Sequence, residues 1–193
     1  MMQAAVQFPI SVEEYLEGEL GSGIKHEYVG GVVYAMAGVS KEHDRIALRL
    51  SAKLLEHLKS PCEVFSSDVK LKAGEDLFYY PDVTVTCDPR EKERYYLQYP
   101  KLVIEVLSPR TERTDRSEKF LAYSSIETMD EYVLVAQEKM QVTVFRRANG
   151  WQPEINEGSA GQLVLASVGM TIPLAEIYQG IDFERERLPE ADE

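Results

Sequence analysis

The chain has 193 residues, of which 44% are hydrophobic, enough for one substantial core. Its formal net charge is −12 at pH 7, and the segment 184–193 contributes −3 of this with five acids and two bases. With this excess of acid, we do not expect the isolated monomer to bind DNA tightly and non-specifically. We expect one domain over residues 1–183, followed by a charged, disordered tail over 184–193.

The first predicted elements are a short helix and a hairpin. Ser11 and Glu14 have the S-x-x-E spacing of a capping box, which predicts a helix starting near Val12 and ending before the glycines at 21 and 23. Two apolar runs, 26–29 and 32–36, then flank Gly30-Gly31. Two glycines between β-branched runs are typical of a tight β-hairpin.

The middle of the chain alternates between helical and extended patterns. A four-residue apolar repeat predicts an amphipathic helix over 43–59, starting near Ser40. Short Val-, Leu-, Tyr- and Thr-rich runs predict strands over 63–65, 68–72, 78–86 and 102–107. The last of these is apolar around a single acid, Glu105, and so should lie inside a sheet.

Further elements complete an α/β plan. The sequence predicts a second helix over 114–124, a strand over 131–136, a hairpin of 142–146 with 151–155, and a last helix over 173–179. The central order is therefore helix, three strands, helix, strand. We expect a mixed central sheet with added N- and C-terminal β-hairpins.

Several site classes find no support in the sequence. Cys62 and Cys87 form no C-x-x-C pair, so we expect two buried thiols with neither a zinc site nor a disulfide. There is no nucleotide-binding glycine loop and no G-x-S-x-G, and the three histidines are scattered. The start of the chain lacks the pattern of a signal peptide, and no stretch approaches the about 20 apolar residues of a membrane span. We therefore expect a cytoplasmic protein that does not bind membranes.

Two acids occur in segments that a folded core should bury. Asp82 lies in YYPDVTV and Glu105 in LVIEVL. A buried carboxylate costs several kcal/mol unless it is paired, protonated or bound to a metal. If the two acids lie on neighbouring strands and point to the same edge, they can share a hard cation such as Mg²⁺, which activates water and neutralises phosphate charge.

The order of Pro81-Asp82 and then Glu105 resembles the PD-(D/E)XK nuclease superfamily. The stretches HEYVGGVVYAMAG, FYYPDVTVTCD, LVIEVLSPRT and DRSEKFLAYSSI, followed by EYVLV, resemble the Uma-two family of predicted restriction endonucleases, common in cyanobacteria. The resemblance runs from about residue 12 to 180. It implies a restriction-endonuclease-like core, a nucleic-acid substrate and Mg²⁺ or Mn²⁺ as the cofactor.

The resemblance also assigns roles. Asp82, Glu105 and the backbone carbonyl of Val106 would hold the metal. Leu107 stands where the superfamily has its lysine, and in the Uma-two family that lysine lies on the following helix, here Lys119. There it would orient or deprotonate the attacking water and offset charge in the transition state. Lys70 is a rival for this role. If the loop between strands 68–72 and 78–82 is centred near Glu75, Asp68 falls opposite Asp82 as a third acid.

Accessory positions have two readings each. His43 and Glu27 match positions that recur in the family, and either could contact a metal-bound water or a phosphate. Alternatively, His43 is a polar residue at a helix end and Glu27 a solvated residue on a strand. Asp115 could simply pair with Lys119 four residues later. Arg110, Arg113 and Arg116 are candidate phosphate contacts, or part of a solvated loop interleaved with acids.

These observations favour a metal-dependent endonuclease in which Asp82 and Glu105 bind the cation and Lys119 assists the water. DNA is the expected partner, and a homodimer is expected because a double-strand break needs two active sites. The charge of −12 and the leucine at position 107 keep open an inactive binding or regulatory module with the same fold. A metal-dependent hydrolase acting on a substrate other than DNA is the third alternative.

Overall fold

The computed structural model describes residues 9–183, so the predicted tail over 184–193 lies outside the described residues. A six-stranded sheet with the order β11-β10-β9-β8-β6-β3 forms the centre. Its strands are β3 (Glu63–Ser66), β6 (Val83–Thr86), β8 (Pro100–Leu107), β9 (Glu131–Ala136), β10 (Gln141–Arg146) and β11 (Pro153–Glu157). Only the β8–β9 pair among these neighbours is parallel, so the sheet is mixed, as predicted.

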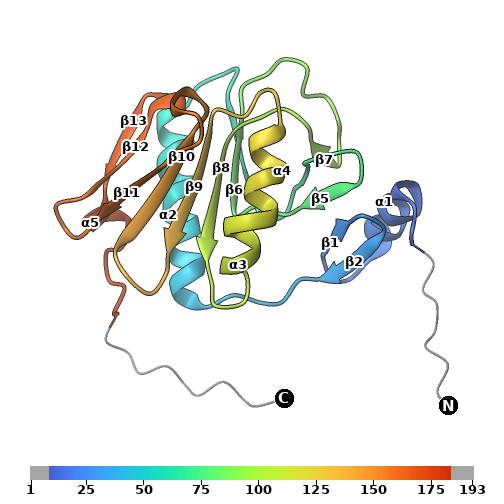
Figure 1. Ribbon diagram of the computed structural model, residues 1–193, viewed down its shortest axis with the longest axis horizontal. Helices are drawn as coiled ribbons and strands as arrows, with labels where there is room; N and C mark the ends of the chain where they lie inside the picture. The colour runs from blue at the N-terminus through green and yellow to red at the C-terminus, as the bar shows by residue number, and fades with distance from the viewer. Residues whose placement is uncertain (1–8, 184–193) are drawn as a thin grey trace, which may run out of the picture.

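Helices cover both faces of the six-stranded sheet (Figure 1). On one face, α2 (Lys41–His57) packs Ile46, Leu50 and Leu54 against β6, β8, β9 and β10. The other face carries α3 (Glu112–Thr114), the π-helical turn η1 (Asp115–Lys119) and α4 (Phe120–Ser125), which follow one another without a break. The chain order α2, β3, β6, β8, α3–α4, β9 is the predicted order of helix, three strands, helix, strand.

Strand β8 is an interior strand with two apolar faces, as its sequence predicts. Leu102, Ile104 and Val106 belong to the core under α2, whereas Val103 and Leu107 belong to the core under α4. Side chains alternate along a strand, so Glu105 faces the same side as Val103 and Leu107. The acid is therefore directed toward the helical segment that carries Lys119.

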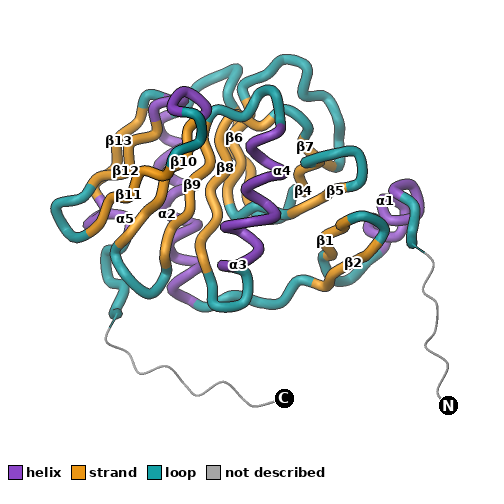
Figure 2. The backbone as a smooth tube through the Cα atoms, viewed as in Figure 1, coloured by secondary structure: helices purple, strands orange, loops and turns teal. Residues whose placement is uncertain are grey.

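A second sheet, with the order β2-β1-β5-β4-β7, lies beside the first (Figure 2). Its strands are β1 (His26–Val29), β2 (Val32–Ala35), β4 (Lys70–Lys72), β5 (Leu77–Tyr79) and β7 (Tyr96–Leu97). The predicted N-terminal hairpin is confirmed: β1 pairs with β2, and Gly30 and Gly31 turn the chain with φ of 56° and 90°. The short strand β7 was not predicted.

The single strand predicted over 78–86 is wrong. Strand β5 ends at Tyr79 and β6 begins at Val83, and the two belong to different sheets. Pro81 lies between them and has no N–H to donate to a ladder, which explains the break. The connecting residues carry the chain from one sheet to the other and leave Asp82 next to the first residue of β6.

The helix starts follow their caps. Helix α1 (Val12–Gly21) has the predicted capping box, with the Ser11 N–H donating to Glu14 at 2.8 Å and the Glu14 N–H donating to Ser11 at 3.2 Å. The N-cap of α2 is Ser40, whose hydroxyl accepts from the His43 N–H at 3.0 Å. Both starts agree with the sequence patterns.

The C-terminal region differs in detail from its prediction. The hairpin of β10 and β11 is confirmed, joined through the 3₁₀ turn η2 (Arg147–Asn149). A further hairpin of β12 (Gln162–Leu165) and β13 (Met170–Pro173), joined by η3 (Ala166–Val168), was not predicted. The last helix, α5 (Leu174–Ile177), is shorter than the predicted 173–179, and Pro173 precedes it as the N-cap.

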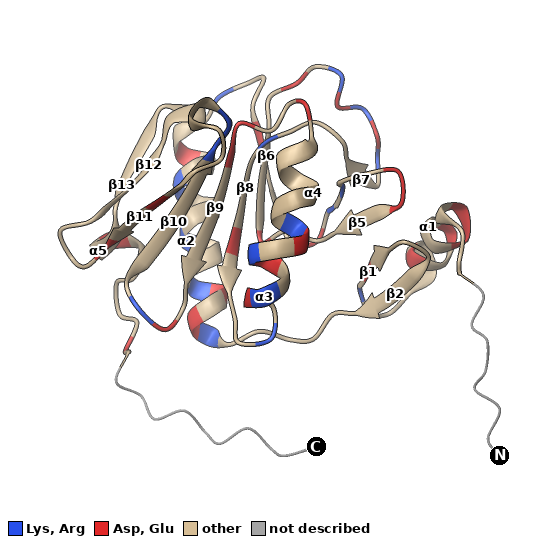
Figure 3. Ribbon diagram, in the orientation of Figure 1, with Lys and Arg blue, Asp and Glu red and all other residues tan. Residues whose placement is uncertain are grey.

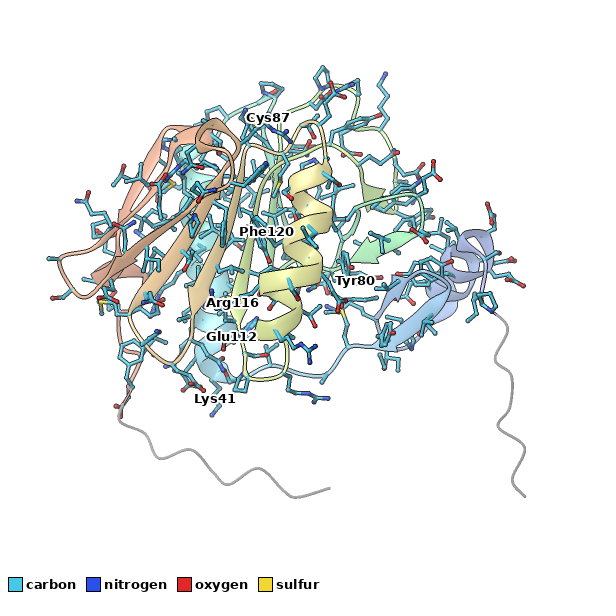
Figure 4. The ribbon with its side chains drawn as sticks, in the orientation of Figure 1. Lys41, Tyr80, Cys87, Glu112, Arg116 and Phe120 are labelled. Atoms are coloured by element: carbon cyan, nitrogen blue, oxygen red, sulfur yellow. A yellow bond between two sulfur atoms is a disulfide. The ribbon has the colours of Figure 1, made fainter. Side chains whose placement is uncertain are left out.

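Cys62 and Cys87 form a disulfide, so the expectation of two free buried thiols is wrong. Glu63 of β3 pairs with Thr86 of β6, which sets the next residue beyond each strand end face to face. A separation of 25 residues in the sequence does not reveal this pairing. Cys87 lies at the end of the sheet opposite Lys41 and Glu112 (Figure 4). Within residues 9–183, no helix is both long and apolar enough for a membrane span.

Candidate functional site

Asp82 and Glu105 meet at the boundary between β6 and β8. These strands are antiparallel, with Val83 opposite Ile104, so the register places Asp82 beside Glu105. The Asp82 N–H donates to Glu105 Oε2 at 3.3 Å. The structure thus brings together the two acids that the sequence singled out.

Glu105 is buried, with 3% of its surface exposed. Its Oε1 atom accepts from the Lys119 ammonium at 3.1 Å and from the Tyr123 hydroxyl at 3.2 Å. Tyr123 is a core residue under α4 whose hydroxyl also contacts this acid. The position of Tyr123 four residues after Lys119, one helical turn away, was the only sequence signal for that contact.

Asp82 is held from two directions. The backbone N–H of Val106 donates to Asp82 Oδ2 at 2.7 Å, and His43 Nε2 lies 2.9 Å from Asp82 Oδ1. The contact that the structure shows for Val106 is therefore through its N–H. His43 is buried at the start of α2, and its Nδ1 has no hydrogen-bond partner among the described residues.

Lys119 lies at the centre of an acidic cluster. Its ammonium is 3.0 Å from Glu27, 3.1 Å from Glu105 and 3.3 Å from Asp115, and its side chain is 6% exposed. The Tyr79 ring lies below it, with the ammonium 5.4 Å from the ring centroid. Both Asp115 and Lys119 belong to the π-helical turn η1, a distortion that occurs often at functional sites.

A cavity of about 430 Å³ opens onto this cluster. Its walls include the strap after β2 (Met36 to Val39) and the residues that lead into α3 (Ser108 to Thr111). Five acidic side chains line it against two basic ones, a formal excess of three negative charges with His43 neutral. These are Glu27, Asp82, Glu105, Asp115 and Glu118, with Arg110 and Lys119.

Burial and charge shift the pKa values in this cluster. Burial raises the pKa of Glu105 well above its usual range, and the neighbouring carboxylates of Asp115, Asp82 and Glu27 raise it further, against the opposing effect of Lys119. Burial likewise raises the pKa of Asp115. Burial alone would lower the pKa of Lys119, but Glu105, Glu27 and Asp115 outweigh it and hold that pKa well above its ordinary value. Lys119 is therefore protonated at neutral pH.

The donor set suits a hard divalent cation. Oxygen ligands and an excess of negative charge are what Mg²⁺ and Mn²⁺ require, and Mg²⁺ commonly uses one or two carboxylates and completes its shell with water and phosphate oxygens. Asp82 and Glu105 supply two such carboxylates from adjacent strand positions, where the backbone N–H of Asp82 donates to Glu105. Across residues 9–183, no group of three or more His, Cys, Asp or Glu side chains converges as a ready-made metal site.

Two of the predicted accessory residues lie elsewhere. The loop between β4 and β5 is centred where expected, since Leu71 pairs with Tyr79 and Lys72 with Phe78. The ladder ends before Asp68 and Asp82 become opposed, and Asp68 is an exposed residue paired with Lys25 at 3.0 Å. The expected third acid at Asp68 is therefore wrong. Lys70 lines a different cavity, so Lys119 alone of the two rival lysines contacts Glu105.

The three arginines are spread around the helix that follows β8. Arg110 lines the cavity, whereas Arg113 is exposed and outside its lining. Arg116 pairs with Glu112 at 2.8 Å on the side of the helix facing β9, away from Tyr80 (Figure 4). Basic and acidic residues alternate along this segment (Figure 3). A single arginine, Arg110, is thus placed to contact a group inside the cavity.

Comparisons with known proteins agree with this architecture. The family model Uma2, described as "Putative restriction endonuclease", matches residues 12–175. The uncharacterized protein slr1290 of Synechocystis sp. is 39% identical over 181 residues, covering 91% of this chain and 95% of that protein. The uncharacterized protein sll1609 of the same organism is 33% identical over 142 residues, covering 71% and 80%.

A solved structure shares the fold. The crystal structure of "a putative nuclease belonging to DUF820" from Anabaena variabilis superposes with a TM-score of 0.72 at 17% identity, covering 88% of this chain and 98% of that one. At this identity the likeness concerns the fold, which is mixed α/β and restriction-endonuclease-like. On the extent of the family match and the relatives' identity, the chain belongs to the Uma2 family of restriction-endonuclease-like proteins.

Proposed function

We propose that this protein is a divalent-cation-dependent endonuclease that hydrolyses phosphodiester bonds in nucleic acid, with Mg²⁺ or Mn²⁺ as its cofactor. The observation that carries the proposal is that the half-buried Asp82 and the buried Glu105 and Lys119 meet at one cavity with an excess of acid. A structural ion pair would need one acid for one lysine. The surplus carboxylates are better explained by a cation that belongs among them.

Asp82 and Glu105 would hold the cation, and their supports keep them in place. His43 and the Val106 N–H orient Asp82, while Tyr123, Lys119 and the Asp82 N–H orient Glu105. When bound, a divalent cation there supplies a coordinated water of lowered pKa and neutralises charge on a phosphate. Cation affinity should rise with pH, because Glu105 must lose its proton to act as a ligand.

Lys119 would act as a fixed positive charge. Its raised pKa keeps it protonated, which makes it unsuited to remove a proton from water at neutral pH. A buried ammonium beside the reacting phosphate can instead offset the charge that develops in the transition state. The raised pKa of Lys119 supports this electrostatic role over the role of a base.

The alternatives differ in what they predict. The inactive-module hypothesis rested on the net charge of −12 and on the leucine at position 107. The charge remains, whereas Lys119 reaches Glu105 from the following helix. A hydrolase with another substrate shares the same residues and is motivated by the acidic composition. Assays on double-stranded DNA, single-stranded DNA, RNA and nucleotides would separate these possibilities: RNA-only cleavage would replace DNA as the substrate, and no turnover on any would favour the binding module.

Cation binding can be measured independently of turnover. Isothermal titration of Mn²⁺ into the wild type should show binding that Asp82→Asn and Glu105→Gln each weaken strongly. Asp68→Asn removes an exposed acid outside the cavity and is the matched control. Equal Mn²⁺ affinity in all four proteins would show that the two acids are not ligands.

A cytoplasmic homodimer remains part of the proposal. Strand β2 is an edge strand of the second sheet, and Val32, Val33 and Tyr34 on it are exposed. Exposed apolar edge strands favour pairing with another chain. Light scattering coupled to size-exclusion chromatography should give twice the mass of the chain, and a Val33→Lys variant should shift the equilibrium toward monomer.

A further inference from the structure

A second cavity, of about 370 Å³, lies beside the first. Tyr80 lines both cavities and is therefore their common wall. On the first side the Tyr80 N–H approaches Glu27 at 3.5 Å, and on the second its hydroxyl donates to Glu19 at 2.8 Å. Tyr80, two positions before Asp82, thus contacts an acid of the cluster around Lys119 on one side and an acid of the second cavity on the other.

The charge of the second cavity is opposite to that of the first. Three basic and two acidic side chains line it, in a chain whose net charge is −12. The basic residues are Lys25, Lys70 and Arg94, and the acids are Glu19 and Asp68. The cavity is therefore a locally basic site within an acidic protein.

The two acids already have partners. Glu19 accepts from the His26 N–H and the Tyr80 hydroxyl, both at 2.8 Å, and lies 3.0 Å from the His26 ring. Asp68 pairs with Lys25 at 3.0 Å. Among the described residues, neither acid forms an ion pair with Lys70 or Arg94, although the charge of Glu19 acts on Lys70.

Lys70 is the unusual member of the set. It is 6% exposed, and its ammonium makes one long contact, 3.5 Å to the Tyr95 carbonyl, while lying 5.5 Å from the centroid of the Tyr80 ring. Among the described residues no acid forms an ion pair with Lys70 or with Arg94 at the cavity rim. A buried ammonium is costly unless anionic or hydrogen-bonding groups satisfy its donors.

We propose that the cavity lined by Lys25, Lys70, Tyr80, Arg94 and Tyr95 binds a phosphate-class oxyanion. Lys70 supplies a point charge with free donors at the base of the site, and Arg94 can add a planar fork of donors from the rim. Burial lowers the pKa of Lys70 and Glu19 offsets only part of that effect, which a bound anion would oppose further. The site itself does not depend on nuclease activity.

Two sources of the anion are open to experiment. It can be a free phosphate or nucleotide, or it can be a backbone phosphate of the nucleic acid that enters the first cavity. The second source rests on the proposed function. In that case the site positions the strand by its backbone and reads no sequence.

The test is isothermal titration of inorganic phosphate, without divalent cations, into the full chain and three variants. Lys70→Met should weaken phosphate binding by about 10-fold or more, the effect of losing a charged hydrogen bond. Arg94→Met should weaken it in the same direction and alters an exposed residue, so it carries the test if Lys70→Met does not fold. Lys101→Met, which removes a surface lysine paired with Asp130, should leave binding unchanged.

A single-stranded oligonucleotide, titrated under the same conditions, distinguishes the two sources. Weaker oligonucleotide binding in both Lys70→Met and Arg94→Met, with a salt slope reduced by about one, identifies a backbone phosphate. If Lys70→Met weakens phosphate binding but both variants bind the oligonucleotide as the wild type does, the ligand is a free oxyanion. Phosphate affinity that is absent in the wild type, or equal in the wild type and the folded variants, overturns the proposal. Because no cleavage is measured, a failed nuclease assay leaves this result intact.

Discussion

Replacing Lys119 by methionine would show how much the cluster depends on one ammonium. Methionine keeps an unbranched apolar chain but removes the charge that lies within 3.0–3.3 Å of Glu27, Glu105 and Asp115. Removing one partner of a buried ion pair costs about 3–5 kcal/mol. For a chain of this length 1 kcal/mol corresponds to about 2–4 °C in Tm, so the expected fall is about 6–20 °C.

The loss should depend on pH in a defined direction. Without Lys119, the pKa values of Glu105 and Asp115, already raised by burial, rise further. The folded state then holds protons that the unfolded state has released, so stability falls as pH increases above the ordinary carboxyl range. Urea unfolding without divalent cations should therefore show a larger deficit at pH 8 than at pH 5, and added Mg²⁺ should recover part of it.

Lys101→Met is the matched control, because it removes a lysine from a partly exposed pair with Asp130. Such pairs contribute about 0–1 kcal/mol. If Lys119→Met destabilised the protein no more than Lys101→Met at pH 8, the ammonium would not be holding the acids and the electrostatic account would be wrong.

Other predictions concern single supports. Without divalent cations, Glu105→Gln should make the free energy of unfolding less dependent on pH from about pH 5 upward. The raised pKa of Glu105 in the folded state disfavours folding at higher pH, and glutamine removes that effect. Urea titrations at two pH values check this. Ser11→Ala should lower the free energy of unfolding by about 1 kcal/mol through loss of the capping box, whereas an unchanged midpoint in urea would refute that cap's contribution. Glu131→Ala should cost about 3–5 kcal/mol, because it removes a buried acid that accepts from Arg146, Ala166 and Ser167 and leaves Arg146 only the exposed Glu154 as an ion-pair partner. A change under 1 kcal/mol in thermal unfolding would contradict this.

The parts of the fold that follow from local pattern could be predicted from the sequence. The continuous apolar run around Glu105 places β8 inside a sheet, and the capping patterns at Ser11 and Ser40 mark two helix starts. The break at Pro81 was missed because the apolar run continues on both sides of it. A run of suitable residues does not show that its two halves join different sheets.

The candidate site was predictable only in part, for a related reason. Asp82 and Glu105 stand out as acids inside apolar runs, and Lys119 followed from the family resemblance. The approach of Glu27 to Lys119 depends on the long-range pairing of β1 with β5, which no local pattern encodes. The same holds for the disulfide of Cys62 and Cys87, which depends on the pairing of β3 with β6.

Cleavage of supercoiled plasmid DNA with Mg²⁺ or Mn²⁺ would show whether Asp82 and Glu105 hold a catalytic cation. The wild type, Asp82→Asn, Glu105→Gln and the control Asp68→Asn would be compared at equal concentration, each checked for folding by circular dichroism. We expect the wild type and Asp68→Asn to nick the plasmid, and we expect Asp82→Asn, Glu105→Gln and chelation of the cation each to abolish nicking. Cleavage that survives both substitutions, or no cleavage with any divalent cation, would contradict this expectation.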